Sequence, residues 1–254
     1  MKRIVIMFLL FVPTFSTLAS DDELSVALVG TKTPGLFDDE IPGPYNVVLD
    51  RITAKYDGPF KIIWEHRRRA FRDFQANSID CLFVSAGRDN SFANFGVPRK
   101  ALIFSSSVNR VTMKIYTLAE DAIVEDMAFL KTQTLALDGG AISVDTAVNQ
   151  FGLTREKLLP TESLTQAFNL LMLGRVEGVL TFDNDYANWR VRTSNFNKYH
   201  TSESFEIDSN EDSIVCKRSP ATVAFIRHVN AAITELKTTN ELAQILAGKS
   251  ATNK

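Results

Sequence analysis

The sequence predicts an α/β protein built as two similar lobes in succession. Short apolar runs, typical of buried strands, alternate with stretches in which apolar residues recur at helical spacing. This alternation occurs between residues 24 and 84 and again between residues 134 and 182. A repeated strand–helix–strand order predicts mostly parallel sheets with helices on both faces. At 254 residues the chain has room for two modest domains.

Turn residues and apolar stripes place the elements of both halves. Val48, Ile52 and Tyr56 form the stripe of the first helix, and Gly174 is a typical helix stop. In the first half, strands and helices are predicted to alternate at residues 24–29, 45–56, 61–64, 66–76 and 79–84. In the second half, we expect strands at 134–137, 176–182 and 213–216, with helices from Ser143, at 161–173 and at 220–236.

The N-terminal 19 residues have the pattern of a secretory signal peptide. Lys2 and Arg3 precede an apolar run at residues 4–12, and Ala19 ends a small-x-small cleavage site. A membrane anchor is the alternative, but the run has about half of the ~20 apolar residues that a spanning helix needs. We therefore expect cleavage, export to the periplasm and no membrane insertion of the mature protein.

Charge and cysteine content narrow the function further. The formal net charge of −2 gives no basic surface, so no nucleic-acid partner is expected. Cys81 and Cys216 are the only cysteines. In an oxidising compartment they can pair, and two buried free thiols are the alternative that the sequence leaves open.

Five segments in order carry a resemblance to a known family: "LVGTKTPGLF", "GPYNVVLDRI", "DFQANSIDCLFV", "RKALIFSSS" and "LLMLGRVEGVL". With them, nearly all of the mature chain resembles the extracellular solute-binding proteins of family 3. That family has the type II periplasmic-binding-protein fold, a two-lobed clamshell. The resemblance implies a signal peptide at 1–19, lobe 1 at 20–112 and 208–254, and lobe 2 at 113–207. The resemblance also implies that the strands of Cys81 and Cys216 are antiparallel neighbours, with the two cysteines at similar heights along them.

The resemblance implies a ligand site between the lobes. Arg99, five residues before Phe104, holds the position at which amino-acid-binding members receive the α-carboxylate. A guanidinium suits that role because it offers a rigid bidentate fork. Asp183 lies close to where those members hold the ammonium group. The other implied ligand-binding residues lie at the first lobe's lip, at a strand end, in an aromatic wall and at a second-lobe helix N-terminus: Thr31, Ser85, Tyr45 (with Phe37 as its alternative), Gly140 and Ser143.

The chain departs from the family's pattern at the expected cleft. Residues 87–96 look like an inserted loop, and Ala141 and Ile142 replace common threonines. Lys32 stands where binders of basic amino acids carry an acid, which argues against a cationic ligand.

The function implied is capture of a small polar, carboxylate-bearing solute by hinge closure, followed by delivery to the permease of an ABC importer. Hinge crossings are expected near residues 111–115 and 205–210, and a monomer without a cofactor is expected. The alternatives are a ligand-sensing module for a receptor and a dehydratase-like enzyme on the same fold. For the enzyme, Glu65 and His66 are the best acid–base candidates. The arginines at 67–69 and at 72 are expected on a solvated helix face.

Overall fold

The computed structural model describes residues 25–86, 97–119, 121, 123–138, 142–193 and 198–248. The predicted signal peptide, Gly140 and the predicted inserted loop at 87–96 lie outside the described residues, as does the side chain of Ser85. The strands are β1 (Val26–Thr31), β2 (Phe60–Glu65), β3 (Cys81–Ala86), β4 (Leu102–Phe104), β5 (Asn109–Leu118), β6 (Leu135–Asp138), β7 (Leu158–Thr161), β8 (Gly178–Phe182), β9 (Tyr199–His200) and β10 (Asp208–Lys217). The helices are α1 (Pro44–Thr53), α2 (Arg67–Gln75), α3 (Met127–Leu130), α4 (Val144–Phe151), α5 (Leu164–Met172), α6 (Asp183–Thr193), α7 (Pro220–Thr238) and α8 (Glu241–Leu246), with short 3₁₀ turns at Arg99–Ala101 and Arg155–Lys157.

Two parallel blocks of strands are joined by two long antiparallel strands. The strand order is β2-β1-β3-β10-β5-β8-β6-β7. β1 runs parallel to β2 and β3, and β6 runs parallel to β7 and β8. β10 is antiparallel to β3 and β5, and β5 is antiparallel to β8. The predicted α/β class is confirmed: the sheet is mixed, the block of strands within each lobe is parallel, and helices cover both faces.

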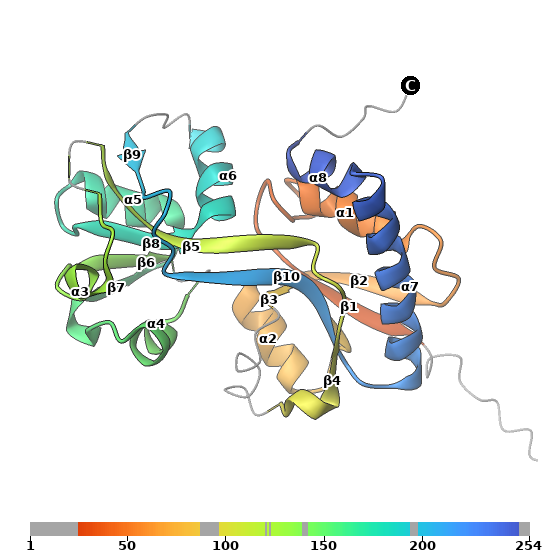
Figure 1. The fold of residues 1–254 in the computed structure, drawn as a ribbon. Helices are drawn as coiled ribbons and strands as arrows, with labels where there is room; N and C mark the ends of the chain where they lie inside the picture. The colour runs from red at the N-terminus through yellow and green to blue at the C-terminus, as the bar shows by residue number, and fades with distance from the viewer. Residues whose placement is uncertain are drawn as a thin grey trace, which may run out of the picture.

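Figure 1 shows two lobes linked by β5 and β10, which run side by side between them. We call β1 to β4 with α1, α2, α7 and α8 lobe 1, and α3 to α6 with β6 to β9 lobe 2. Each buried apolar cluster combines residues of one lobe with residues of a connecting strand: one contains Phe83 and Phe225 of lobe 1, and another contains Phe168 and Trp189 of lobe 2. The cleft between the lobes is therefore bounded by two separately packed bodies.

Local sequence explains where the major helices begin and end. Pro220 opens α7, and the Ser219 hydroxyl before it accepts a hydrogen bond from the Thr222 N–H. Gly174 follows α5 with φ of 62°, so the predicted helix stop is correct. The polar segment at Asp183–Thr193 was not predicted as a helix, because too few of its residues form an apolar stripe.

Cys81 and Cys216 form a disulfide in the core of lobe 1. They are directly opposite each other on the antiparallel strands β3 and β10, with a Cα–Cα distance of 4.0 Å. Both residues are fully buried. The bond therefore ties β10, one of the two strands that connect the lobes, to the centre of lobe 1.

Candidate functional site: a charged cleft between the lobes

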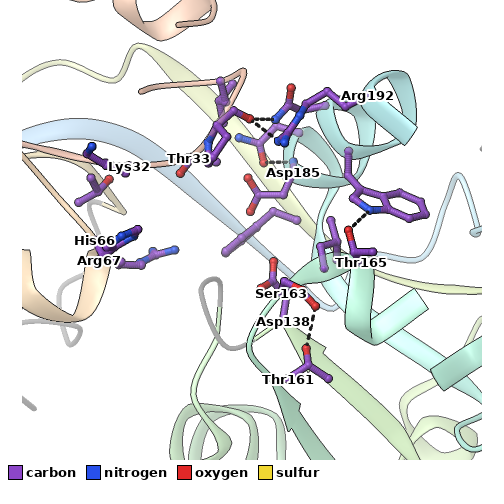
Figure 2. A pocket seen from close by; sticks show the side chains of 18 of the residues that line it. Lys32, Thr33, His66, Arg67, Asp138, Thr161, Ser163, Thr165, Asp185 and Arg192 are labelled. Carbon is purple, nitrogen blue, oxygen red and sulfur yellow. Dashed lines mark hydrogen bonds between the residues drawn. The ribbon is translucent and has the colours of Figure 1, made fainter. Parts of the chain in front are cut away.

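A cleft of about 640 Å³ lies between the lobes and over the two connecting strands. Lobe 1 contributes the loop that follows β1 and the junction between β2 and α2. Lobe 2 contributes the end of β6, residues 161–165 and one face of α6. Val111 of β5 and Asp212 of β10 lie at its base. Figure 2 shows that these walls carry mostly polar and charged side chains.

Arg67 is one of two cations, with Lys32, that lobe 1 presents to this cleft. It is the first residue of α2, two residues after the end of β2, and it lines the cleft beside His66 (Figure 2). Its charge lowers the pKa of both Asp185 and Asp212, against stronger opposing effects. The helix face predicted to be solvated is therefore divided, because Arg69 and Arg72 are exposed and pair with Glu65 and Asp73.

Asp185 is one of the acids that lobe 2 presents to the cleft. It lies in the first turn of α6, and its partly buried side chain points into the cleft (Figure 2). Burial, followed by the negative charge of Asp138, raises the pKa of Asp185 to about 7. Asp138, at the end of β6, lines the same wall. The lobe 2 wall thus places two carboxyl groups opposite Arg67, while Arg192 of the same wall donates a hydrogen bond to the Pro34 carbonyl.

Asp212 forms part of the base of the cleft and is only 5% exposed. Its carboxylate accepts a hydrogen bond of 2.6 Å from the Tyr45 hydroxyl. The Asn109 amide donates a second bond of 2.8 Å to the Tyr45 oxygen. Burial raises the pKa of Asp212 to about 6, although the Tyr45 bond and the Arg67 charge both lower it. Tyr45 thus supports the base of the cleft from within lobe 1.

Lys32 lines the cleft, but its charge is compensated within lobe 1. Its Nζ atom lies 2.5 Å from an Asp39 carboxylate oxygen and 3.5 Å from one of Glu40. The hydrogen bond to Asp39 raises the pKa of Lys32. Because Asp39 and Glu40 compensate its charge, Lys32 does not argue against a cationic ligand.

The structure brings only one of the described residues expected at the ligand site to the cleft lining. Thr31, at the end of β1, lines the cleft. Tyr45 is 1% exposed and packs in the lobe 1 core, because its ring stacks on Phe83 while its hydroxyl binds Asp212. Ser143 is the N-cap of α4, where its hydroxyl accepts the Thr146 N–H.

The two charged residues expected to hold a ligand also have other surroundings. Arg99 is exposed, outside the residues that line the cleft, and its guanidinium lies 5.0 Å from the centre of the Phe104 ring. Asp183 accepts hydrogen bonds from the Thr112 and Asn184 N–H groups, so it fastens α6 to β5. A signal for Arg67 existed in the sequence, since it lies in the first turn of the helix predicted at 66–76, close after the strand predicted at 61–64, where parallel sheets place functional groups.

Two structural findings bear on other classes of function. Across the described ranges, no group of three or more His, Cys, Asp or Glu side chains is arranged to hold a metal ion. In the same ranges, no helix combines the length and apolar character needed to cross a bilayer. Of the predicted acid–base pair, His66 lines the cleft, whereas Glu65 is paired with Arg69 at 3.0 Å.

No protein-family model and no curated protein sequence matches the chain. Solved structures do match. The GluR0 ligand-binding core in complex with L-glutamate is 16% identical, with a TM-score of 0.68, over 89% of this chain and 96% of that one. A mutant of ArgBP from T. maritima is 16% identical, with a TM-score of 0.67, over 90% and 96%.

A histidine kinase sensor domain with similarity to periplasmic binding proteins is 12% identical, with a TM-score of 0.67, over 89% of this chain and 96% of that one. The TM-scores and coverages establish the fold, whereas identities this low leave the ligand open. The predicted resemblance is confirmed at that level: the chain has the two-lobed fold of the type II periplasmic binding proteins.

Proposed function

We propose that this protein binds a small zwitterionic solute, an amino acid or a similar molecule, between its two lobes. The observation that carries the proposal is the opposition of charges across the cleft. Arg67 stands on the lobe 1 wall, and Asp185 and Asp138 stand on the lobe 2 wall. A solute with a carboxylate and an ammonium group would complement both walls at once.

In the proposed complex, Arg67 receives the carboxylate. A guanidinium remains charged at all accessible pH values and can donate two parallel hydrogen bonds to one carboxylate. The ammonium group of the solute lies against Asp185, with Asp138 nearby. Its positive charge would favour the ionised form of a carboxyl whose pKa is raised to about 7 in the structure.

Binding is proposed to close the lobes about the connecting strands. The hinge would lie where β5 and β10 leave lobe 1, near residues 111–115 and 205–210, which places the division of the lobes close to residues 112 and 208. Contacts from both walls to one solute would stabilise the closed arrangement over the open one. The disulfide on β10 supports a rigid lobe 1 as one of the two moving bodies.

We further propose that the mature protein is periplasmic and delivers its solute to the permease of an ABC importer. A ligand-sensing role for a receptor is the second candidate, because a histidine kinase sensor domain matches the chain as well as ArgBP does, with a TM-score of 0.67 in each case. Co-purification from membranes under mild crosslinking separates the two: an importer permease supports delivery, whereas a receptor supports sensing.

The experiment that tests solute binding is a calorimetric screen of the mature chain. The panel pairs each amino acid with two analogues, one that lacks the ammonium group and one with an amidated carboxyl group. The proposal expects a zwitterion to bind and both of its analogues to lose most of the affinity. Equal binding of the analogue without the ammonium group would contradict the role of Asp185, and equal binding of the amidated analogue would contradict the role of Arg67. Chemical turnover of a bound compound would favour an enzyme.

A further inference from the structure

The two lobes touch directly at one edge of the cleft, through the Pro34 carbonyl of lobe 1. This oxygen accepts a hydrogen bond of 2.6 Å from the Asn188 side-chain amide and one of 2.8 Å from the Arg192 guanidinium. Asn188 and Arg192 are four residues apart on α6, so both side chains lie on the same face of that helix. Figure 2 shows the two bonds as dashed lines that converge above Asp185.

The loop that carries this carbonyl is held in shape by its own backbone hydrogen bonds. The Thr33 N–H donates to the Phe37 carbonyl at 2.7 Å, and the Gly35 N–H donates to the Ile41 carbonyl at 2.7 Å. Gly35 has a φ of 77°, a conformation that only glycine adopts at low cost. A Cβ atom on Gly35 would lie 2.7 Å from Asn188 Oδ1 and 3.1 Å from Arg192 Cδ. The absence of a side chain at Gly35 therefore allows α6 to lie close to the backbone of this turn.

We infer that Asn188 and Arg192 act as a latch on the Pro34 carbonyl that holds the cleft closed. All the bonding groups belong to the protein, so the latch favours the closed arrangement independently of any solute contact. Asn188 and Arg192 are therefore positioning residues, which set the population of the closed state and through it the apparent affinity. This inference rests on the proposed function only in treating closure as the binding step.

The latch can be tested without a ligand, by measuring the distance between the lobes. The substitutions Lys55→Cys, after α1, and Ala187→Cys, on α6, put a spin label on each lobe at exposed positions. The native cysteines are joined in a buried disulfide, so the label reacts only with the introduced thiols. Distance distributions are then recorded by double electron–electron resonance for the labelled chain, for Asn188→Ala with Arg192→Ala, and for Gly35→Ala.

The matched control is Asn169→Ala with Arg175→Ala. It removes the same two kinds of side chain from exposed positions of lobe 2 that do not line the cleft. Circular dichroism and a melting curve for every variant establish that it is folded.

The latch predicts a longer-distance population in both latch variants. For the double variant the open-to-closed ratio should rise between about threefold and tenfold; a tenfold rise corresponds to about 1.4 kcal/mol. The control should match the parent chain. A distribution unchanged by the latch substitutions, or an equal change in the control, would overturn the inference. A failed solute screen would instead count against the proposed function, since no solute enters this measurement.

Discussion

The Tyr45 hydroxyl donates a hydrogen bond of 2.6 Å to the carboxylate of Asp212, joining α1 of lobe 1 to the strand β10 that links the lobes. Both residues are at least 95% buried. The bond lowers the pKa of Asp212, which burial raises to about 6. The base of the cleft thus contains a carboxyl group whose ionised form depends on one tyrosine.

The substitution Tyr45→Phe should reduce stability more at pH 8 than at pH 5. At pH 8 Asp212 is ionised and loses its donor, at a cost of about 1–3 kcal/mol. At pH 5, below the folded-state pKa of about 6, the carboxyl is mostly protonated and the loss is smaller. Urea unfolding at both pH values measures this. The control is Tyr56→Phe, which should cost little, since the described residues include no carboxylate bonded to the Tyr56 hydroxyl. An equal loss for Tyr45→Phe at both pH values would contradict the assignment.

Asp185→Asn should make the unliganded protein more stable at pH 8. The folded-state pKa of Asp185, about 7, lies above its ordinary value of 3.8, so its contribution to stability is full below pH 4 and is lost as the pH rises through 7. The amide carries no such loss. Each pKa unit corresponds to ~1.4 kcal/mol, so a gain on the order of 2 kcal/mol is expected at pH 8, fading toward pH 4. Thermal melts of both proteins from pH 4 to 8 measure how this gain in stability changes with pH. A difference in stability that does not change with pH would show that the Asp185 carboxyl is not its cause.

Removal of the disulfide should destabilise the protein by about 2–5 kcal/mol. The bond joins residues separated by 135 positions, so its loss frees a long loop in the unfolded chain. Unfolding of Cys81→Ala with Cys216→Ala is compared with that of the native chain. Alkylation under denaturing, non-reducing conditions supplies the check on the premise: native protein should take up no label, and two labelled cysteines would show that the pair is not formed.

The fold could be predicted from sequence patterns because its apolar runs repeat clearly. The residues of the candidate site could be predicted only in part. Asp185, Asn188 and Arg192 lie on α6, a helix that cannot be predicted from an apolar stripe because its sequence is mostly polar. Family position pointed to Arg99, whereas the arginines that line the cleft are Arg67 and Arg192. Arg69, two residues after Arg67 on α2, is exposed and pairs with Glu65 instead. The sequence left open whether Cys81 and Cys216 are bonded, because their pairing depends on the register of β3 against β10.

The most direct test of the central claim is a solute-induced shift in melting temperature for the native chain, Arg67→Ala and Arg99→Ala. A solute at about 100 times its dissociation constant adds ~2.7 kcal/mol, a rise of roughly 5–10 °C for a chain of this size. The account predicts that an amino-acid-like zwitterion gives this rise in the native chain and in Arg99→Ala, and that Arg67→Ala loses it. A shift that survives in Arg67→Ala and disappears in Arg99→Ala would contradict the proposed cleft site, and no shift with any zwitterion would contradict the proposed ligand class.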